Sequence, residues 1–112
     1  MQIEVVVVGG GPAGSAAAVT LARGGRSVLV VDKAHFPRDK CCGDGLTTMA
    51  LRLGEHLGLD PGPLADWQPV DSAVVHSPSG RTIRFPLPSG DGSYAAVVPR
   101  MSYDAALLDL AR

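Results

Sequence analysis

Three glycines near the N-terminus have the spacing of a phosphate-binding turn. Gly9, Gly11 and Gly14 fit G-x-G-x-x-G directly after an apolar run, where the first glycine makes a tight turn and the second lets the backbone approach a pyrophosphate. The helix that follows would direct its free N–H groups at the phosphates, so no basic side chain is needed beside them, and the stretch holds none. A tight turn without a ligand is the alternative.

A carboxylate follows this turn at the spacing of a ribose contact. The apolar run from Ser27 to Val31 ends in Asp32, about 20 residues after the first glycine, where a carboxylate can accept hydrogen bonds from the hydroxyls of an adenosine ribose. A solvated strand end is the alternative. Lys33, which comes next, favours the ribose role, but Asp32 alone does not separate FAD from NAD.

The elements around these residues form a βαβ pattern. The run from Ile3 to Val8 is continuous and β-branched, as is typical of a parallel strand buried on both faces. A helix is predicted from Pro12 to Arg23, with small residues on the face that approaches the sheet and glycines at its exit. A right-handed crossover then makes the two strands parallel.

Short elements and loops are predicted for the rest of the chain. Residues 34–46 are polar and rich in glycine, which predicts a loop, and Thr47 is expected to cap a helix that ends at Gly58. Ser102 is expected to cap the last helix, after a turn at 99–101. The other predictions are a proline-rich connection over 58–70, strands at 71–77, 81–85 and 94–98, a turn at 78–80 and a loop over 86–93.

Composition limits the class of protein. The 112 residues are 46% hydrophobic and 19% charged with a net charge of -1, which suits a globular domain and gives no basic surface for nucleic acid. The N-terminus lacks the positive region of a secretory signal, so a cytoplasmic location is expected. The histidines share no ligand spacing with Cys41 and Cys42, so no metal site is expected. A disulfide between these two adjacent cysteines would strain the peptide between them, so both thiols are expected to stay reduced. Two parallel strands are too few for a Rossmann sheet, so the chain is expected to be a fragment.

A second motif carries a resemblance to a known family. The stretch from Phe36 to Leu46, F-P-R-D-K-C-C-G-D-G-L, together with the glycine turn and Asp32, resembles the N-terminus of the geranylgeranyl reductase family of FAD-dependent oxidoreductases. Arg100, Asp104 and Leu107 resemble the R-x-x-x-D-x-x-L stretch with which that family returns to its FAD domain. Cys41 departs from the pattern, because it makes an unusual vicinal pair.

The resemblance implies an α/β architecture like that of p-hydroxybenzoate hydroxylase. A Rossmann-like FAD-binding βαβ unit is interrupted there by an antiparallel hairpin of a substrate domain, and the fold is incomplete in the sequence given. Residues 1–69 are expected to be the first segment of the FAD-binding domain, 70–93 the start of the substrate-binding sheet, and 94–112 the return to the FAD-binding domain.

The resemblance also implies the residues of the site. Arg38 or Lys40 beside the flavin would stabilise its reduced form, and Cys42 is the expected catalytic residue, facing the flavin to orient the substrate or donate a proton. The alternative is that these are ordinary loop residues. Asp44 either approaches the flavin or forms a turn. The expected cofactor-binding set is Gly9, Gly11, Pro12, Ala13, Gly14, Asp32, Lys33, Arg38, Lys40, Cys42, Gly43, Asp44, Gly45 and Arg100.

Members of the resembled family reduce isolated double bonds in isoprenoid chains of lipids, chlorophyll precursors or quinones. The resemblance therefore implies FAD as cofactor, NAD(P)H or another reduced carrier as electron donor, and an isoprenoid substrate. It also admits a peripheral membrane contact through segments beyond these 112 residues, which alone are expected to be inactive. A flavin-dependent monooxygenase or halogenase and a non-catalytic ADP-binding fragment are the alternatives.

Overall fold

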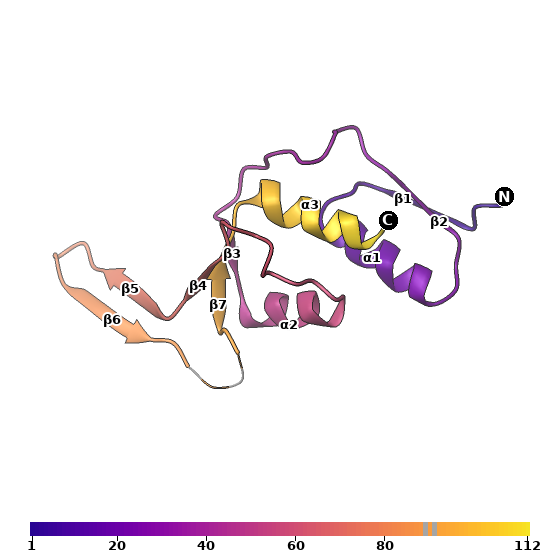
Figure 1. Ribbon diagram of the computed structural model, residues 1–112. Helices are drawn as coiled ribbons and strands as arrows, with labels where there is room; N and C mark the ends of the chain where they lie inside the picture. Colours follow the sequence, from indigo (N-terminus) through magenta and orange to yellow (C-terminus); the bar gives the residue numbers. More distant parts are fainter. Residues whose placement is uncertain (89, 91) are drawn as a thin grey trace.

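The computed structural model describes residues 1–88, 90 and 92–112 and has an elongated shape, 61 × 30 × 23 Å (Figure 1). Its strands form three small sheets, with the orders β1-β2, β3-β7-β4 and β5-β6. This α/β arrangement, a parallel unit followed by antiparallel strands, confirms the predicted fold class. Ser89 and Asp91, which fall in the loop predicted over 86–93, lie outside the described residues.

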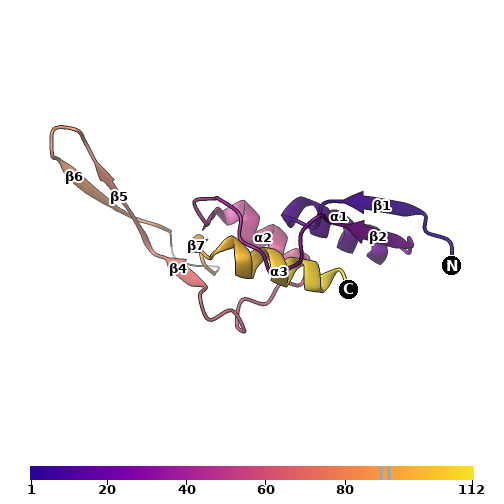
Figure 2. The ribbon, with the colours of Figure 1, turned by 90° about the horizontal axis from the view of Figure 1, so that it is seen from above.

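The βαβ unit forms as the sequence predicts, but β1 is not buried on both faces, since Val6 and Val8 are 55% and 84% exposed. Strand β1 (Val5–Val8) pairs in parallel with β2 (Val28–Val31), and helix α1 (Pro12–Arg23) connects them. Figure 2 shows both strands running along one side of α1. Ala18 and Val19 of α1 are buried, because small side chains on this face let the helix approach the strands closely.

Two of the three strands of the second sheet form in segments for which the sequence predicts no strand. Strand β7 (Ala95–Val97) pairs antiparallel with β3 (Gly45–Leu46) and with β4 (Gln68–Val70). The loop predicted over 34–46 and the connection predicted over 58–70 are therefore wrong at their C-terminal ends, which form β3 and β4. These short segments become strands because β7, which is distant in sequence, supplies hydrogen-bond partners for their backbone groups. No local sequence pattern predicts this pairing.

The two later helices follow different capping rules. Helix α2 (Thr48–His56) begins after Thr47, whose side chain accepts the Ala50 N–H at 3.3 Å as predicted. Helix α3 (Arg100–Leu110) begins three residues earlier than predicted, with Pro99 in place of Ser102 at the position before its first residue. The carbonyl of Pro99 accepts the N–H groups of Ser102 and Tyr103, so the turn predicted at 99–101 is the first turn of the helix. Ser102 does not cap it; the hydroxyl donates to Asp66.

The core of the described chain gathers around α3. Val98, Tyr103 and Leu107 are buried together, and Trp67 packs against them. The hairpin of β5 (Ser72–His76) and β6 (Thr82–Pro86) forms as predicted, with its turn at 78–80, and projects away from this core (Figure 1). None of the helices among the described residues is long and apolar enough to cross a membrane. The segment boundaries at 69/70 and 93/94 stay a prediction.

Candidate functional site

The glycine turn joins β1 to α1 with almost no space between them. A Cβ added to Gly14 would lie 1.8 Å from the Gly9 carbonyl oxygen and 3.3 Å from Val7 Cγ1. Gly9 itself has φ +105°, a backbone conformation that side chains disfavour. Its N–H donates to the Val31 carbonyl oxygen at 2.7 Å, which fixes the start of the turn against the end of β2.

The same turn presents backbone donors to open space. A Cβ on Gly11 would meet only Arg38 Nη2 within 4 Å, at 3.6 Å. The N–H groups of Ala13 and Gly14 donate to no acceptor among residues 1–88, 90 and 92–112. Unpaired N–H groups at the positive end of a helix, reached across a residue without a side chain, suit an anionic phosphate. These residues therefore fit the pyrophosphate of a dinucleotide such as FAD.

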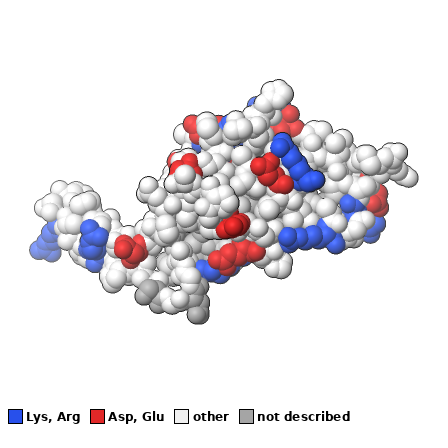
Figure 3. Space-filling view, in the orientation of Figure 1, with Lys and Arg blue, Asp and Glu red and all other residues white. Residues whose placement is uncertain are grey.

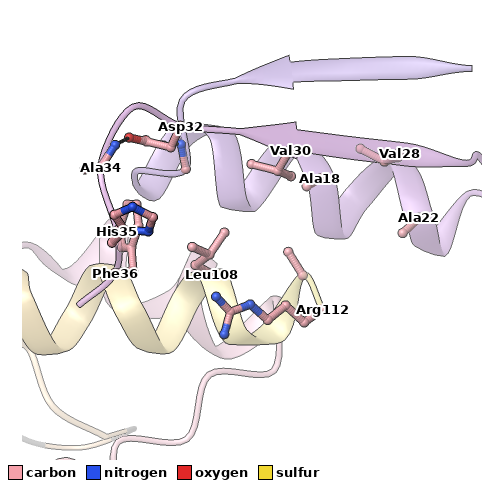
Figure 4. Close-up of a pocket in the computed structure, with 12 residues that line it drawn as sticks. Ala18, Ala22, Val28, Val30, Asp32, Ala34, His35, Phe36, Leu108 and Arg112 are labelled. Carbon is pink, nitrogen blue, oxygen red and sulfur yellow. Dashed lines mark hydrogen bonds between the residues drawn. The ribbon is translucent and has the colours of Figure 1, made fainter. Parts of the chain in front are cut away.

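Asp32 lies beside the turn and binds it directly. Its Oδ2 accepts the Gly10 N–H at 2.7 Å, and its Oδ1 accepts the Ala34 N–H at 2.8 Å (Figure 4). These bonds, from Ala34 first and then Gly10, hold the pKa of the Asp32 carboxyl below its ordinary value of 3.8. Because each carboxylate oxygen has two lone pairs, both oxygens can still accept hydroxyl groups of a ribose.

We expect Asp32→Asn in the full-length protein to lower its FAD content, since an amide nitrogen cannot accept either an N–H or a hydroxyl. The measurement is flavin absorbance per protein after gel filtration. Asp39→Asn is the control, because the exposed Asp39 side chain accepts only the N–H of Lys40. Equal flavin content in the two variants would contradict the role assigned to Asp32.

The Asp32 carboxylate also gives the variant a pH signature. A carboxyl group whose folded-state pKa is depressed stabilises the fold above its unfolded-state pKa, and loses that contribution as pH falls through the folded-state value. The stability difference between wild type and Asp32→Asn should therefore be constant at neutral pH and shrink below about pH 3.9, the ordinary value for aspartate. A difference that grows on acidification would show that the lowered pKa is wrong.

A groove of about 410 Å³ extends from Asp32 between β2, α1 and α3. Val28 and Val30 of β2 face Ala18 of α1 across it, and Leu108 approaches from α3 (Figure 4). Apart from Asp32, His35 and Arg112, its lining side chains are apolar or absent. Asp32 and His35 lie at the end of the groove that meets the glycine turn, and Arg112 lies at the C-terminal end of α3 (Figure 4).

Two arginines of the expected site meet at one buried carboxylate. Arg38 Nη1 donates to Asp104 Oδ2 at 2.6 Å, and Arg100 donates to the same carboxylate through Nε and Nη2 at 2.7 and 2.9 Å. The arginine side chains are 19% and 20% exposed, and that of Asp104 is 0% exposed. Although the glycine stretch itself holds no basic side chain, Arg38 lies beside Gly11, and Asp104 from a distant part of the sequence holds it there.

Cys42 lies on a pocket that reaches the start of α1. The pocket, about 220 Å³, is bordered by five residues of the expected set: Pro12, Cys42, Asp44, Gly45 and Arg100. The Asp44 N–H and the Arg100 guanidinium hold the pKa of the Cys42 thiol below its ordinary value, so a larger fraction of the thiol is thiolate at neutral pH. Asp44 adopts φ 57°, and its carbonyl accepts the Val98 N–H at 3.0 Å.

Other residues of the expected set lie apart from this pocket. The side chains of Lys33 and Lys40 are exposed and make no hydrogen bond or ion pair with the part of the chain that the structure describes. Gly43 is exposed, and a Cβ there would meet nothing within 4 Å. Cys41 is exposed as well and does not pack in the core. The cofactor role of the expected set stays a prediction.

Two contributors to the site were given no role from sequence. Asp104 was noted only as part of a motif, although its position one helical turn after Arg100 is a signal for an i, i+4 ion pair. Phe36 supports the Arg38 guanidinium, which lies 4.6 Å from the ring centroid, within the range of a cation–π contact. This second contact follows from a loop conformation that spacing alone does not reveal.

Comparison with known proteins agrees with the geometry of the turn. The family described as FAD dependent oxidoreductase matches residues 4–53. A menaquinone reductase of Mycolicibacterium smegmatis is 43% identical over 98% of this chain and 27% of its own length, and a geranylgeranyl diphosphate reductase of Rhodobacter capsulatus is 34% identical over 99% and 26%. The chain thus spans about a quarter of the length of these curated relatives.

Solved structures give the same answer for the fold. A flavoprotein/dehydrogenase from Cytophaga hutchinsonii superposes with a TM-score of 0.81 at 28% identity, covering 99% of this chain and 28% of that one. A geranylgeranyl bacteriochlorophyll reductase-like protein from Thermoplasma acidophilum has a TM-score of 0.77 at 29% identity, covering 96% and 27%. The flavin-dependent brominase Bmp2 has a TM-score of 0.79 at 27% identity, covering 99% and 27%.

Fold, glycine turn and relatives agree on the class: this chain is similar to the N-terminal part of FAD-dependent oxidoreductases. Within that class it is related to the menaquinone and geranylgeranyl reductases, as the motif from Phe36 to Leu46 predicted. FAD binding is implied by this relationship.

Proposed function

We propose that the full-length protein is an FAD-dependent reductase of carbon–carbon double bonds in an isoprenoid chain, with menaquinone, a prenylated quinone, as its substrate. The observation that carries this proposal is the 43% identity to a menaquinone reductase along 98% of the chain. A menaquinone reductase of Mycobacterium tuberculosis adds support, since it is 66% identical over 50% of this chain. These identities favour menaquinone over the lipid substrates that the sequence left open.

Different residues of the site would bind different parts of FAD. The N–H groups at the start of α1, with Arg38 Nη2 close by, would bind the pyrophosphate of FAD. Asp32 would bind the adenosine ribose, and the pocket bordered by Cys42 and Arg100 would face the flavin end. FAD when bound supplies the electron transfer. An electron donor such as NAD(P)H is part of the proposal.

Cys42 is the proposed catalytic residue, at a point where an acid can deliver a proton to the substrate. Reduction of an alkene requires a proton as well as a hydride equivalent, and the exposed Cys42 borders the same pocket as the apolar Leu46, Ala50 and Val98. An apolar pocket would admit the isoprenoid chain and exclude water from the reaction.

The charge distribution is compatible with an uncharged substrate chain. On the face shown in Figure 3, acidic and basic groups are interspersed and neither sign forms a continuous field. Nothing on this face would steer a polyanion toward the protein.

The test uses anaerobically reduced full-length protein mixed with menaquinone. We expect the flavin absorbance to return as saturated side chains accumulate, measured by mass spectrometry. The TM-score of 0.79 to a flavin-dependent brominase makes a monooxygenase or halogenase the second candidate. Flavin reoxidation only after oxygen is admitted, with a hydroxylated or halogenated product, would replace the proposed function by this one.

Cys42→Ala provides a residue-level prediction in the same assay. FAD should stay bound, because the substitution leaves the N–H groups at the start of α1 and the Asp32 carboxylate unchanged, whereas the rate of menaquinone reduction should fall by about 100-fold, as for loss of a general acid. Cys41→Ala is the matched control, since Cys41 does not border the pocket, and should leave the rate unchanged. Equal rates in the two variants would remove Cys42 from the mechanism.

A further inference from the structure

Asp104 connects two parts of the candidate site that are far apart in sequence. Its carboxylate has no exposure to solvent, and it binds Arg38 from the loop after β2 and Arg100 from the first turn of α3. A buried carboxylate is tolerated when it is paired and hydrogen-bonded. Here three N–H···O bonds of 2.6 to 2.9 Å satisfy both oxygens.

In each of the two arginines, one terminal nitrogen of the guanidinium makes no hydrogen bond to Asp104. Arg38 uses only Nη1 for the carboxylate, so its Nη2 reaches the glycine turn, 3.6 Å from the point where a Gly11 Cβ would be. Arg100 binds edge-on through Nε and Nη2. Its Nη1 is not used in that pairing and lies on the guanidinium edge away from Asp104, and Arg100 borders the same pocket as Cys42.

We propose that Asp104 is a positioning residue that holds Arg38 against the glycine turn and Arg100 beside Cys42, so that one buried charge fixes both ends of the site. The identity of the anion at the turn rests on the proposed function. The arrangement of the two arginines does not, because it is given by the hydrogen bonds to Asp104.

The charges around Cys42 make its reactivity a reporter of this positioning. Arg100 faces it from α3, and Asp44 faces it from its own loop, where the backbone N–H favours the thiolate and the carboxylate opposes it. Contact with Asp104 raises the pKa of Arg100, so Arg100 stays a cation throughout the titration of the thiol. If Asp104 positions Arg100, removal of the Asp104 charge should take that cation away from Cys42.

The experiment measures the alkylation rate of Cys42 by iodoacetamide against pH in the flavin-free full-length protein, with peptide mass spectrometry to isolate this site. Asp104→Asn should shift the profile to higher pH and lower the rate at pH 7 by about 3- to 10-fold, since one pKa unit is about tenfold in thiolate. Asp104→Glu, which keeps the charge, should restore part of the rate. Asp109→Asn removes an exposed carboxylate from the same helix and should change nothing.

A second measurement tests whether Asp104 positions Arg38 at the glycine turn. Titration of the same flavin-free proteins with ADP, by calorimetry, should give Asp104→Asn a dissociation constant about 10-fold weaker than wild type, as expected when a charge-assisted contact is lost. Neither readout involves menaquinone. A protein that shows both effects yet reduces no menaquinone would refute the proposed function and leave this proposal standing.

Two outcomes would overturn the proposal. An unchanged profile in a folded Asp104→Asn variant would show that Arg100 needs no positioning, and a shift to lower pH would show that Asp104 competes for the charge of Arg100. Should Asp104→Asn fail to fold, Arg100→Lys takes its place, because lysine keeps the cation but cannot bind a carboxylate edge-on through two N–H groups. The same upward shift is expected, and its absence would refute the positioning role.

Discussion

Gly14→Ala is expected to unfold or severely destabilise the FAD-binding unit. The added methyl would lie 1.8 Å from the Gly9 carbonyl oxygen and 2.9 Å from its carbonyl carbon, so the backbone of the turn would have to move. Both sides of the contact are backbone, and neither can rotate away as a flexible side chain would. Overpacking of a core typically costs about 1–3 kcal/mol, and we expect a loss of at least about 3 kcal/mol because a rigid group is displaced here.

The measurement is urea unfolding of the full-length protein, followed by circular dichroism and flavin fluorescence. Gly43→Ala is the matched control, because a Cβ at Gly43 would meet nothing within 4 Å and its φ is not in the left-handed region. If the two variants unfolded at the same urea concentration, α1 would have to lie farther from β1 than the structure shows.

Gly11→Val has the second largest expected effect, on cofactor affinity and not on folding. Gly11 has φ −70° and ψ −173°, an extended conformation that valine adopts readily. The side chain would therefore be accommodated by the backbone but would fill the space in front of the α1 N–H groups. We expect the dissociation constant for FAD to rise by about 100-fold, equivalent to ~2.8 kcal/mol.

Titration of flavin-free protein with FAD, followed by quenching of flavin fluorescence, measures this effect. Circular dichroism should match wild type, in contrast to Gly14→Ala. Gly11→Ala should fall between wild type and Gly11→Val, because its single methyl would meet only Arg38 Nη2, at 3.6 Å. Retention of wild-type affinity by Gly11→Val would mean that the pyrophosphate does not pass this position.

The two glycine predictions separate two functions that one motif combines. Gly14 is required because α1 and β1 touch, and Gly11 is proposed to be required because a ligand and α1 touch. At Gly14 the contact is with the protein's own backbone, whereas at Gly11 the proposed contact is with a bound ligand. A turn without a ligand, the alternative raised by the sequence, would need Gly14 and tolerate a side chain at Gly11.

The local elements follow from the sequence because their causes are local. A β-branched run, a glycine turn and a row of small residues predict β1, α1 and β2, and Thr47 caps α2 as expected. The start of α3 was mispredicted because Ser102 resembles a cap, whereas the Pro99 carbonyl already accepts the first helical N–H groups. The preference of serine for caps was outweighed by the backbone conformation of its neighbours.

The sequence alone predicts the glycine turn, the carboxylate that follows it and the family resemblance, since each depends on residues within one short stretch. Only the tertiary structure decided that β3 and β4 pair with β7, and that Asp104 gathers Arg38 and Arg100. Arg38 and Asp104 are 66 residues apart. Such contacts arise from burial, because a carboxylate taken out of water must find cations wherever the fold places them, and no pattern along the chain records that requirement.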